Sequence, residues 1–219
     1  MSLTEKNYKS RLIDDKISEY LKIFGAISIV GPKWCGKTWT AFNYANSVSF
    51  MTEKSESELA KVNPKYIFNE ERPQLIDEWQ LVPTIWDAVR HECDKDHNKG
   101  KFILTGSTTL TKEEEEENVY HSGAGRIALM NMYPTSLYES GDSTGDISIT
   151  DMINGTANLK RIGKIELEKI AQLVIRGGWP ENINVEVEKQ GIIPKSYIDS
   201  VIYKDINERK DKKAFKVFV

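Results

Sequence analysis

The chain has 219 residues, of which 39% are hydrophobic and 29% charged, a composition typical of a soluble globular protein. Its 30 basic and 33 acidic residues give a net charge of −3, which excludes an overall electrostatic attraction to nucleic acid. No apolar run approaches the roughly 20 residues that span a bilayer, and the opening MSLTEKNYKS lacks an apolar signal segment. We therefore expect a cytoplasmic protein that does not contact a membrane.

The first half of the chain alternates helix patterns with strand patterns. Residues 11–24 place Leu12, Ile13, Ile17, Tyr20, Leu21 and Phe24 on one stripe, which predicts an amphipathic helix. The apolar run AISIV, residues 26–30, predicts a buried strand that leads directly into GPKWCGKT. The further predicted elements are helices over 37–47, 55–63 and 82–96, and strands over 48–52, 73–80, 101–107 and 126–134. In the helix over 82–96, Ile85, Trp86 and Val89 stand at core spacing.

This alternation predicts an α/β fold with a parallel sheet covered by helices on both faces. The segment GPKWCGKT after its first strand, with the spacing G-x-x-x-x-G-K-[ST], indicates the P-loop NTPase type. Five glutamates, Glu113 to Glu117, interrupt the alternation, and we expect them to be solvated and without chemical function. Residues 141–155 are rich in Gly, Ser, Thr and Asp, which predicts a long loop and a boundary. The chain is thus divided into a P-loop domain, 1–140, and a linker with a small helical region, 141–219, containing helices over 164–178 and 194–208.

The segment GPKWCGKT fits G-x-x-x-x-G-K-[ST], a loop whose backbone N–H groups surround a phosphate. Lys37 is expected to neutralise the β- and γ-phosphate oxygens, and the Thr38 hydroxyl to coordinate Mg²⁺. ATP and Mg²⁺ are the expected ligands. The predicted nucleotide-binding residues are Gly31, Pro32, Lys33, Trp34, Cys35, Gly36, Lys37 and Thr38, with Ser107 added from a later strand.

Two adjacent acids follow the apolar pair in PQLIDEWQ, where the predicted strand ends. Ligands of open α/β sheets gather at the carboxyl ends of the strands. Asp77 is therefore expected to hold the metal ion, and Glu78 to polarise a water molecule for attack on the γ-phosphate. This pair favours hydrolysis over binding alone.

Two further segments contribute residues to the predicted site. Thr105 and Ser107, in KFILTGS, stand where the next strand ends, so that a hydroxyl there could hydrogen-bond the attacking water or the γ-phosphate. Arg126 precedes the last predicted strand and is flanked by glycines, a position from which it could reach a phosphate of its own or a neighbouring subunit. A surface arginine without a role is the alternative interpretation.

The two cysteines, Cys35 and Cys93, show no metal-ligand spacing, and both are expected to be reduced thiols. Cys35 lies among backbone N–H groups where a helix is predicted to begin, an environment that lowers a thiol pKa. We expect Cys35 to react quickly with alkylating agents and to be protected by Mg-ATP.

Taken in order, GPKWCGKT, LIDEWQ, FILTGS, GAGRIALMNMYPTSLYE and GGWPE resemble the predicted prokaryotic ATPases of the AAA+ superfamily. In that family an AAA-type domain precedes a C-terminal domain of unknown function, so the resemblance implies that YIDSVIYKDI begins a domain that is cut short. It also implies that Arg126 acts on the nucleotide of a neighbouring subunit in a homo-oligomer. Trp34 and Cys35 depart from the smaller or polar residues usual in this loop.

The leading hypothesis is an ATPase whose hydrolysis switches or moves an unknown client protein. One alternative is a nucleotide-gated scaffold with little turnover. A P-loop kinase would need a basic lid, whereas the candidate segment TTLTKEEEEEN is acidic. DNA binding rests on analogy alone with related ATPases. A solvated helix face explains the clustered lysines near the end better than a DNA-binding patch does. These lysines are Lys204, Lys210, Lys212 and Lys213.

Overall fold

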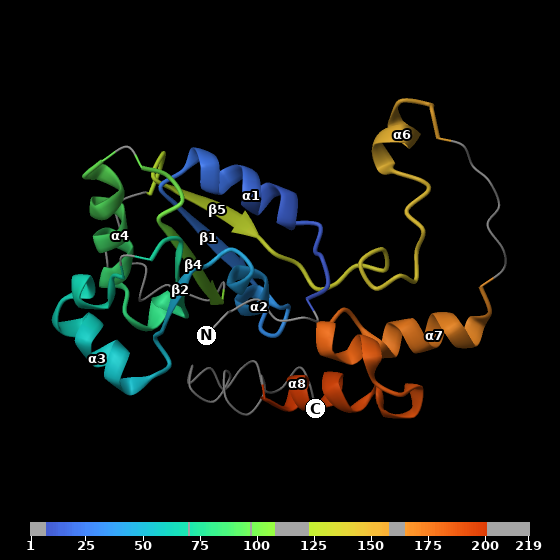
Figure 1. Cartoon of the computed structure of the whole chain (residues 1–219). Coiled ribbons are helices and arrows are strands. Elements are labelled where there is room, and N and C mark those ends of the chain that lie inside the picture. Colours follow the sequence, from blue (N-terminus) through green and yellow to red (C-terminus); the bar gives the residue numbers. More distant parts are fainter. Residues whose placement is uncertain (1–7, 70, 97, 108–122, 158–164, 201–219) are drawn as a thin grey trace, which may run out of the picture. The chain divides into compact units, whose positions relative to one another are not determined.

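The computed structural model describes residues 8–69, 71–96, 98–107, 123–157 and 165–200 (Figure 1). The chain divides into two compact units, unit 1 comprising Met1–Glu139 and unit 2 comprising Ser140–Val219. The glutamate run 113–117 and the four lysines of the tail lie outside the described residues. In the described part of the chain, no helix combines the length and the apolar character that crossing a membrane would require.

Unit 1 is built on a five-stranded sheet in the order β2-β3-β4-β1-β5, in which every neighbouring pair is parallel. The predicted parallel α/β fold is therefore confirmed. Because parallel strands run in the same direction, the ends of β1, β3 and β4 lie along one edge of the sheet. The strands are β1 (Ala26–Gly31), β2 (Ser47–Phe50), β3 (Gln74–Asp77), β4 (Phe102–Ser107) and β5 (Ile127–Asn131).

Helices cover both faces of this sheet, because successive strand side chains point to opposite faces. On β4, Ile103 belongs to one apolar cluster, whereas Phe102 and Leu104 belong to the other. The first cluster includes Ile17 of helix α1 and Ala41 of helix α2. The helices of unit 1 are α1 (Asp14–Ile23), α2 (Lys37–Phe42), α3 (Lys54–Val62) and α4 (Thr84–Asp94), with short 3-10 turns η1 (Pro64–Ile67) and η2 (Trp79–Leu81).

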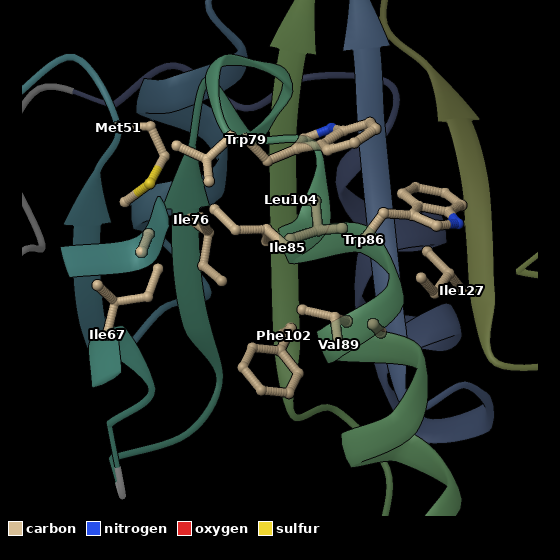
Figure 2. Packing of buried hydrophobic residues seen from close by; sticks show 13 residues of the cluster. Met51, Ile67, Ile76, Trp79, Ile85, Trp86, Val89, Phe102, Leu104 and Ile127 are labelled. Atoms are coloured by element: carbon tan, nitrogen blue, oxygen red, sulfur yellow. The ribbon is translucent and has the colours of Figure 1, made fainter. Parts of the chain in front are cut away.

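The second cluster lies between α4 and the sheet, as Figure 2 shows. Ile85, Trp86 and Val89 of α4 point toward the strands, which confirms the core positions predicted for this helix. The Trp86 ring also packs on Trp79, with ring centroids 5.0 Å apart. This packing fixes η2, and with it the segment that follows β3.

Several predicted boundaries were wrong. Helix α1 starts at Asp14, so Leu12 precedes it and is exposed, while the other five residues of the stripe pack on the sheet. Helix α2 ends at Phe42 instead of residue 47. At this end the Asn43 side-chain amide donates to the Trp39 carbonyl at 3.0 Å. Strand β3 ends at Asp77, because Glu78 has the left-handed φ of 53°.

The described part of unit 2 contains helices α6 (Ile149–Ile153), α7 (Leu167–Arg176) and α8 (Ile192–Ser200), with 3-10 turns η3 (Pro180–Asn184) and η4 (Val187–Lys189). The loop predicted over 141–155 was partly wrong, since α6 forms there with Ser148 as its cap: the Ser148 hydroxyl accepts from the Asp151 N–H at 2.9 Å. Helix α7 ends at Arg176, before Gly177, whose φ is 65°. Helix α8 begins two residues before the predicted start.

Candidate nucleotide site

The loop between β1 and α2 depends on two glycines for different reasons. A Cβ atom on Gly31 would stand 2.2 Å from the Met132 carbonyl oxygen, so no larger residue fits between β1 and the segment after β5. Gly36 has a φ of 99°, a backbone conformation that residues with a side chain rarely adopt. Trp34 also has a positive φ, 64°, although it is not glycine. The loop thus has the tight curvature that its sequence predicted.

Lys37 begins α2, and its side chain folds back over the start of the loop. It is buried, and its Nζ donates to the Gly31 carbonyl at 2.9 Å and to the Pro32 carbonyl at 2.8 Å. A buried ammonium is stable only with polar partners, and here backbone carbonyls supply them. The structure therefore holds one cation at the centre of the loop, whereas Pro32, Lys33 and Trp34 are exposed at its surface.

Asp77 joins three elements of the predicted site. The hydroxyls of Thr38 and Thr105 both donate to its Oδ1, at 2.8 and 2.6 Å. The strand register explains the second contact, because Asp77 and Thr105 are paired neighbours on β3 and β4. Asp77 and Thr105 are buried and Thr38 is partly buried. Three residues predicted from three separate motifs are thus in contact.

These oxygens suit a magnesium ion. Mg²⁺ prefers hard oxygen donors and is commonly held by one or two carboxylates together with substrate phosphates and water. Asp77 provides a carboxylate, and the Thr38 hydroxyl lies 2.8 Å from it. Within the described ranges, no group of three or more His, Cys, Asp and Glu residues is arranged to hold a metal ion. An ion at Asp77 and Thr38 would therefore complete its shell with phosphate and water.

Glu78 follows Asp77 directly and accepts a hydrogen bond from the side-chain amide of Gln80. Gly106 of β4 leaves the room for Gln80, since a Cβ there would stand 2.3 Å from the Gln80 Oε1. This assigns a packing role to the glycine of the Thr-Gly-Ser segment. Gln80 was not among the predicted residues, because a single glutamine two residues after an acid gives no recognisable signal.

The remaining predicted residues fall at different places. Ser107 ends β4 and pairs in register with Gly31, so its backbone adjoins the loop. Arg126 precedes β5, and its carbonyl accepts from the Ala26 N–H at the opposite edge of the sheet. Five steps along β1 at about 3.3 Å each separate these edges by roughly 16 Å. The Arg126 side chain is half exposed and pairs with Asp94 at 2.8 Å. The structure thus does not bring Arg126 to the loop of its own chain.

The expectation of a reactive Cys35 thiol was wrong. Cys35 is buried, with 1% of its surface exposed. Burial raises the pKa of the thiol, and the nearby charges of Lys37 and Arg11, which act to lower it, do not offset that effect. The sequence pattern identified the favourable charges but not the burial. Cys35 and Cys93 are both free cysteines, as expected.

Two residues absent from the predicted site contact the loop or support it. The Arg11 guanidinium donates to the Cys35 carbonyl at 2.8 Å and forms an ion pair with Glu139 at 2.9 Å. Glu139 is the last residue of YPTSLYE, a segment that contributed to the family resemblance but in which no site residue was predicted. Arg11 opens the first amphipathic stretch, where a basic residue attracts no notice.

Comparisons with known proteins identify the family and support the fold. A family model described as an AAA domain matches residues 24–141, which is more than half of the chain. Among solved structures, the Walker-type ATPase of Pyrococcus abyssi matches with a TM-score of 0.56 and 14% identity, covering 98% of this chain and 81% of that one. At that identity the likeness shows a shared fold. A search of curated proteins found no match.

Proposed function

The chain belongs to the AAA domain family, and from this premise we propose that it is a magnesium-dependent ATPase whose hydrolysis switches or moves a client protein. The family and the fold support an ATP-binding NTPase. One observation carries the finer proposal. The P-loop hydroxyl of Thr38 and the strand-end carboxylate of Asp77 are hydrogen-bonded to each other, beside the buried ammonium of Lys37.

In this proposal each side chain has a distinct task. Lys37 leaves its two loop carbonyls to bind the phosphate oxygens, and Thr38 and Asp77 hold Mg²⁺. Bound Mg²⁺ offsets the negative charge of the phosphates. Glu78 orients the attacking water and accepts its proton, while the Gln80 amide donates to one of its two carboxylate oxygens. Thr105 keeps Asp77 in place through their 2.6 Å hydrogen bond.

Phosphate release tests the role of Glu78. Glu78→Gln should bind ATP like the wild type but release phosphate about 10² to 10⁴ times more slowly, because a general base is lost. Glu53→Gln is a matched control, since it removes the charge of an exposed acid near the end of β2. Chelation of Mg²⁺ with EDTA should reduce release to background. Equal and slow release by wild type and Glu78→Gln, with ATP still bound, would favour the nucleotide-gated scaffold instead.

ATP affinity tests the loop itself. Lys37→Ala should weaken ATP binding at least about tenfold, or about 1.4 kcal/mol, because the variant loses the loop's buried cation. Calorimetry with Lys33→Ala as the control separates the two lysines of the loop, since Lys33 is exposed. Unchanged affinity of Lys37→Ala would overturn the proposed site.

Arg126 belongs to the proposal as a residue acting in trans within a homo-oligomer. Its place at the far edge of the sheet supports action on a neighbour over action on its own loop. Mixing Arg126→Ala chains with Lys37→Ala chains should restore hydrolysis, because each supplies what the other lacks at a shared interface. A mixture no more active than its components, beside an active wild type, would contradict the action of Arg126 in trans. The client, the cytoplasmic location and any nucleic-acid partner also remain proposals.

A further inference from the structure

A buried ion pair joins the two sequence ends of unit 1. Arg11 Nε lies 2.9 Å from Glu139 Oε1, and each side chain is only 7% exposed. The pair lines a cavity of about 400 Å³ between the start of α1 and the segment after β5. Removing two charges from water is unfavourable unless each one is well paired. Each member of this buried pair therefore needs further polar partners.

Arg11 also donates to two backbone carbonyls. Nη1 donates to the Cys35 carbonyl and Nη2 to the Tyr133 carbonyl, both at 2.8 Å. A guanidinium presents its donors in a rigid plane, so that these contacts are fixed relative to one another. One side chain thereby connects the P-loop, the segment after β5 and Glu139.

Glu139 is itself held on both oxygens. The Leu12 N–H donates to Oε1 at 2.8 Å, and the N–H and hydroxyl of Ser136 donate to Oε2 at 2.7 and 2.9 Å. A carboxylate fixed by three donors besides Arg11 cannot follow a moving partner. Glu139 therefore anchors the guanidinium in one orientation.

The contact with Cys35 has a consequence inside the P-loop. The peptide unit between Cys35 and Gly36 is planar and trans, so its carbonyl and its N–H point in opposite directions. When Arg11 holds the Cys35 carbonyl, the Gly36 N–H faces the side of the loop away from Arg11. Backbone N–H groups are what such a loop offers to phosphate. Releasing the carbonyl would allow this peptide to rotate.

We propose that Arg11 is a positioning residue for phosphate binding, which fixes the Cys35–Gly36 peptide of the P-loop while Glu139 fixes Arg11. The inference rests on the proposed function, because it assumes that the loop binds phosphate. It predicts that loss of Arg11 weakens the binding of any triphosphate, independently of the nucleoside. Inorganic tripolyphosphate is therefore the appropriate probe beside ATP.

The decisive variant replaces the whole pair, with Arg11→Met and Glu139→Leu together. Replacing both charges of a buried pair by apolar residues is often neutral or stabilising, because neither charge is left buried without its partner. The Cys35 carbonyl still lacks its donor. We expect thermal unfolding near that of the wild type, and affinities for ATP and tripolyphosphate about tenfold lower by calorimetry. Wild-type affinities in the folded double variant would overturn the proposal.

A second variant covers the case in which the double variant does not fold. Arg11→Lys keeps the charge, but one ammonium cannot reach Cys35, Tyr133 and Glu139 in the same geometry. It should bind tripolyphosphate several-fold more weakly, whereas Arg90→Lys, whose ion-pair partners Asp87 and Asp94 belong to α4, should bind normally. Binding by Arg11→Lys equal to that of Arg90→Lys would contradict the role of Arg11.

Lys37→Ala separates this inference from the proposed function. If Lys37→Ala loses ATP binding while the Arg11 variants keep it, only the positioning role fails. If Lys37→Ala binds ATP and tripolyphosphate like the wild type, the loop is not a phosphate site and both proposals fail.

Discussion

Unit 1 buries isoleucine, leucine and phenylalanine side chains on both faces of its sheet, whereas the described part of unit 2 buries Arg176, Asn182 and Gln190. Many large apolar residues of that part are exposed instead. They include Leu167, Ile170, Val174, Ile175, Ile192 and Ile198.

The buried residues of unit 2 form a connected polar network. Arg176 pairs with Asp142 at 2.7 Å, and the Asn182 amide donates to the carbonyls of Arg176 and Gln190 at 2.7 and 2.9 Å. Apolar packing is non-directional and tolerates small shifts, but hydrogen bonds and ion pairs depend on geometry and charge. The two units are therefore expected to resist different perturbations.

The largest contrast is expected from truncation of apolar side chains. Phe102→Ala should destabilise unit 1 by about 3–5 kcal/mol, because it empties a fully buried site between β4 and α4. Ile170→Ala on α7 should cost less than about 0.5 kcal/mol, because Ile170 is already 46% exposed. Chemical denaturation measures both. Similar losses from the two variants would show that α7 packs in an apolar core after all.

Removal of a buried charge from unit 2 should destabilise that unit and leave the sheet of unit 1 unchanged. Arg176→Met should lower the free energy of opening unit 2 by about 3 kcal/mol, since it leaves Asp142 without its buried partner. Hydrogen exchange of the α7 amides measures this loss, and the sheet amides should not change. Lys169→Met is the control, because Lys169 is 45% exposed and also pairs with Asp142, at 3.3 Å. Equal effects of the two variants would contradict a special role for Arg176.

Acid should affect unit 2 before unit 1. Burial acts to raise the pKa of Asp142, but hydrogen bonds from Ser140, Arg176 and Lys169 outweigh it and the pKa is lowered. A lowered folded-state pKa stabilises the protein above the unfolded value of about 3.9, and this contribution disappears as the pH falls through the folded value. NMR spectra recorded as the pH falls through this range should therefore lose α7 signals before sheet signals.

Glu139 of unit 1 has a lowered pKa as well. Burial acts to raise it, and the N–H groups of Ser136 and Leu12 together with Arg11 outweigh that effect. Unit 1 loses this contribution in acid but keeps its apolar core. Simultaneous loss of both sets of signals would mean that the two units unfold together.

The smallest effect concerns the two thiols, which both lie in unit 1. Burial raises the pKa of Cys93 to about 11, which leaves about 100-fold less thiolate than the ordinary value of 9.0. Cys35 is more deeply buried. Alkylation should therefore remain slow in urea concentrations that open only unit 2, and should accelerate when the sheet unfolds. Fast alkylation of Cys35 in native buffer would contradict its burial.

The success of the sequence predictions followed the range of the interactions. The alternation of strands and helices and the core positions Ile85, Trp86 and Val89 were predictable, because local periodicity reports which side chains face a sheet. The contact of Thr38, Asp77 and Thr105 followed from three strand ends at one edge. Whether these residues hydrolyse ATP stays a prediction.

Interactions that depend on tertiary packing were not predictable. Nothing near Cys35 in the sequence indicates that Met132 and Arg11 enclose it, so its pKa was expected to shift in the wrong direction. Arg11 and Glu139 are 128 positions apart, and their pairing has no local signature. At the early end of α2, the Asn43 side chain donates to the Trp39 carbonyl, a contact that weighs little in a propensity argument.

The strand order has a consequence for how the protein is made. Strand β1 carries the P-loop, yet its neighbours in the sheet are β4 and β5, so that it has no hydrogen-bonding partner until the chain has been synthesised beyond Ser107. Pairing strands that are far apart in sequence slows folding, because the intervening chain must be closed into a loop first. We therefore expect a ribosome-bound chain that ends before β4 to present the complete P-loop sequence without a P-loop.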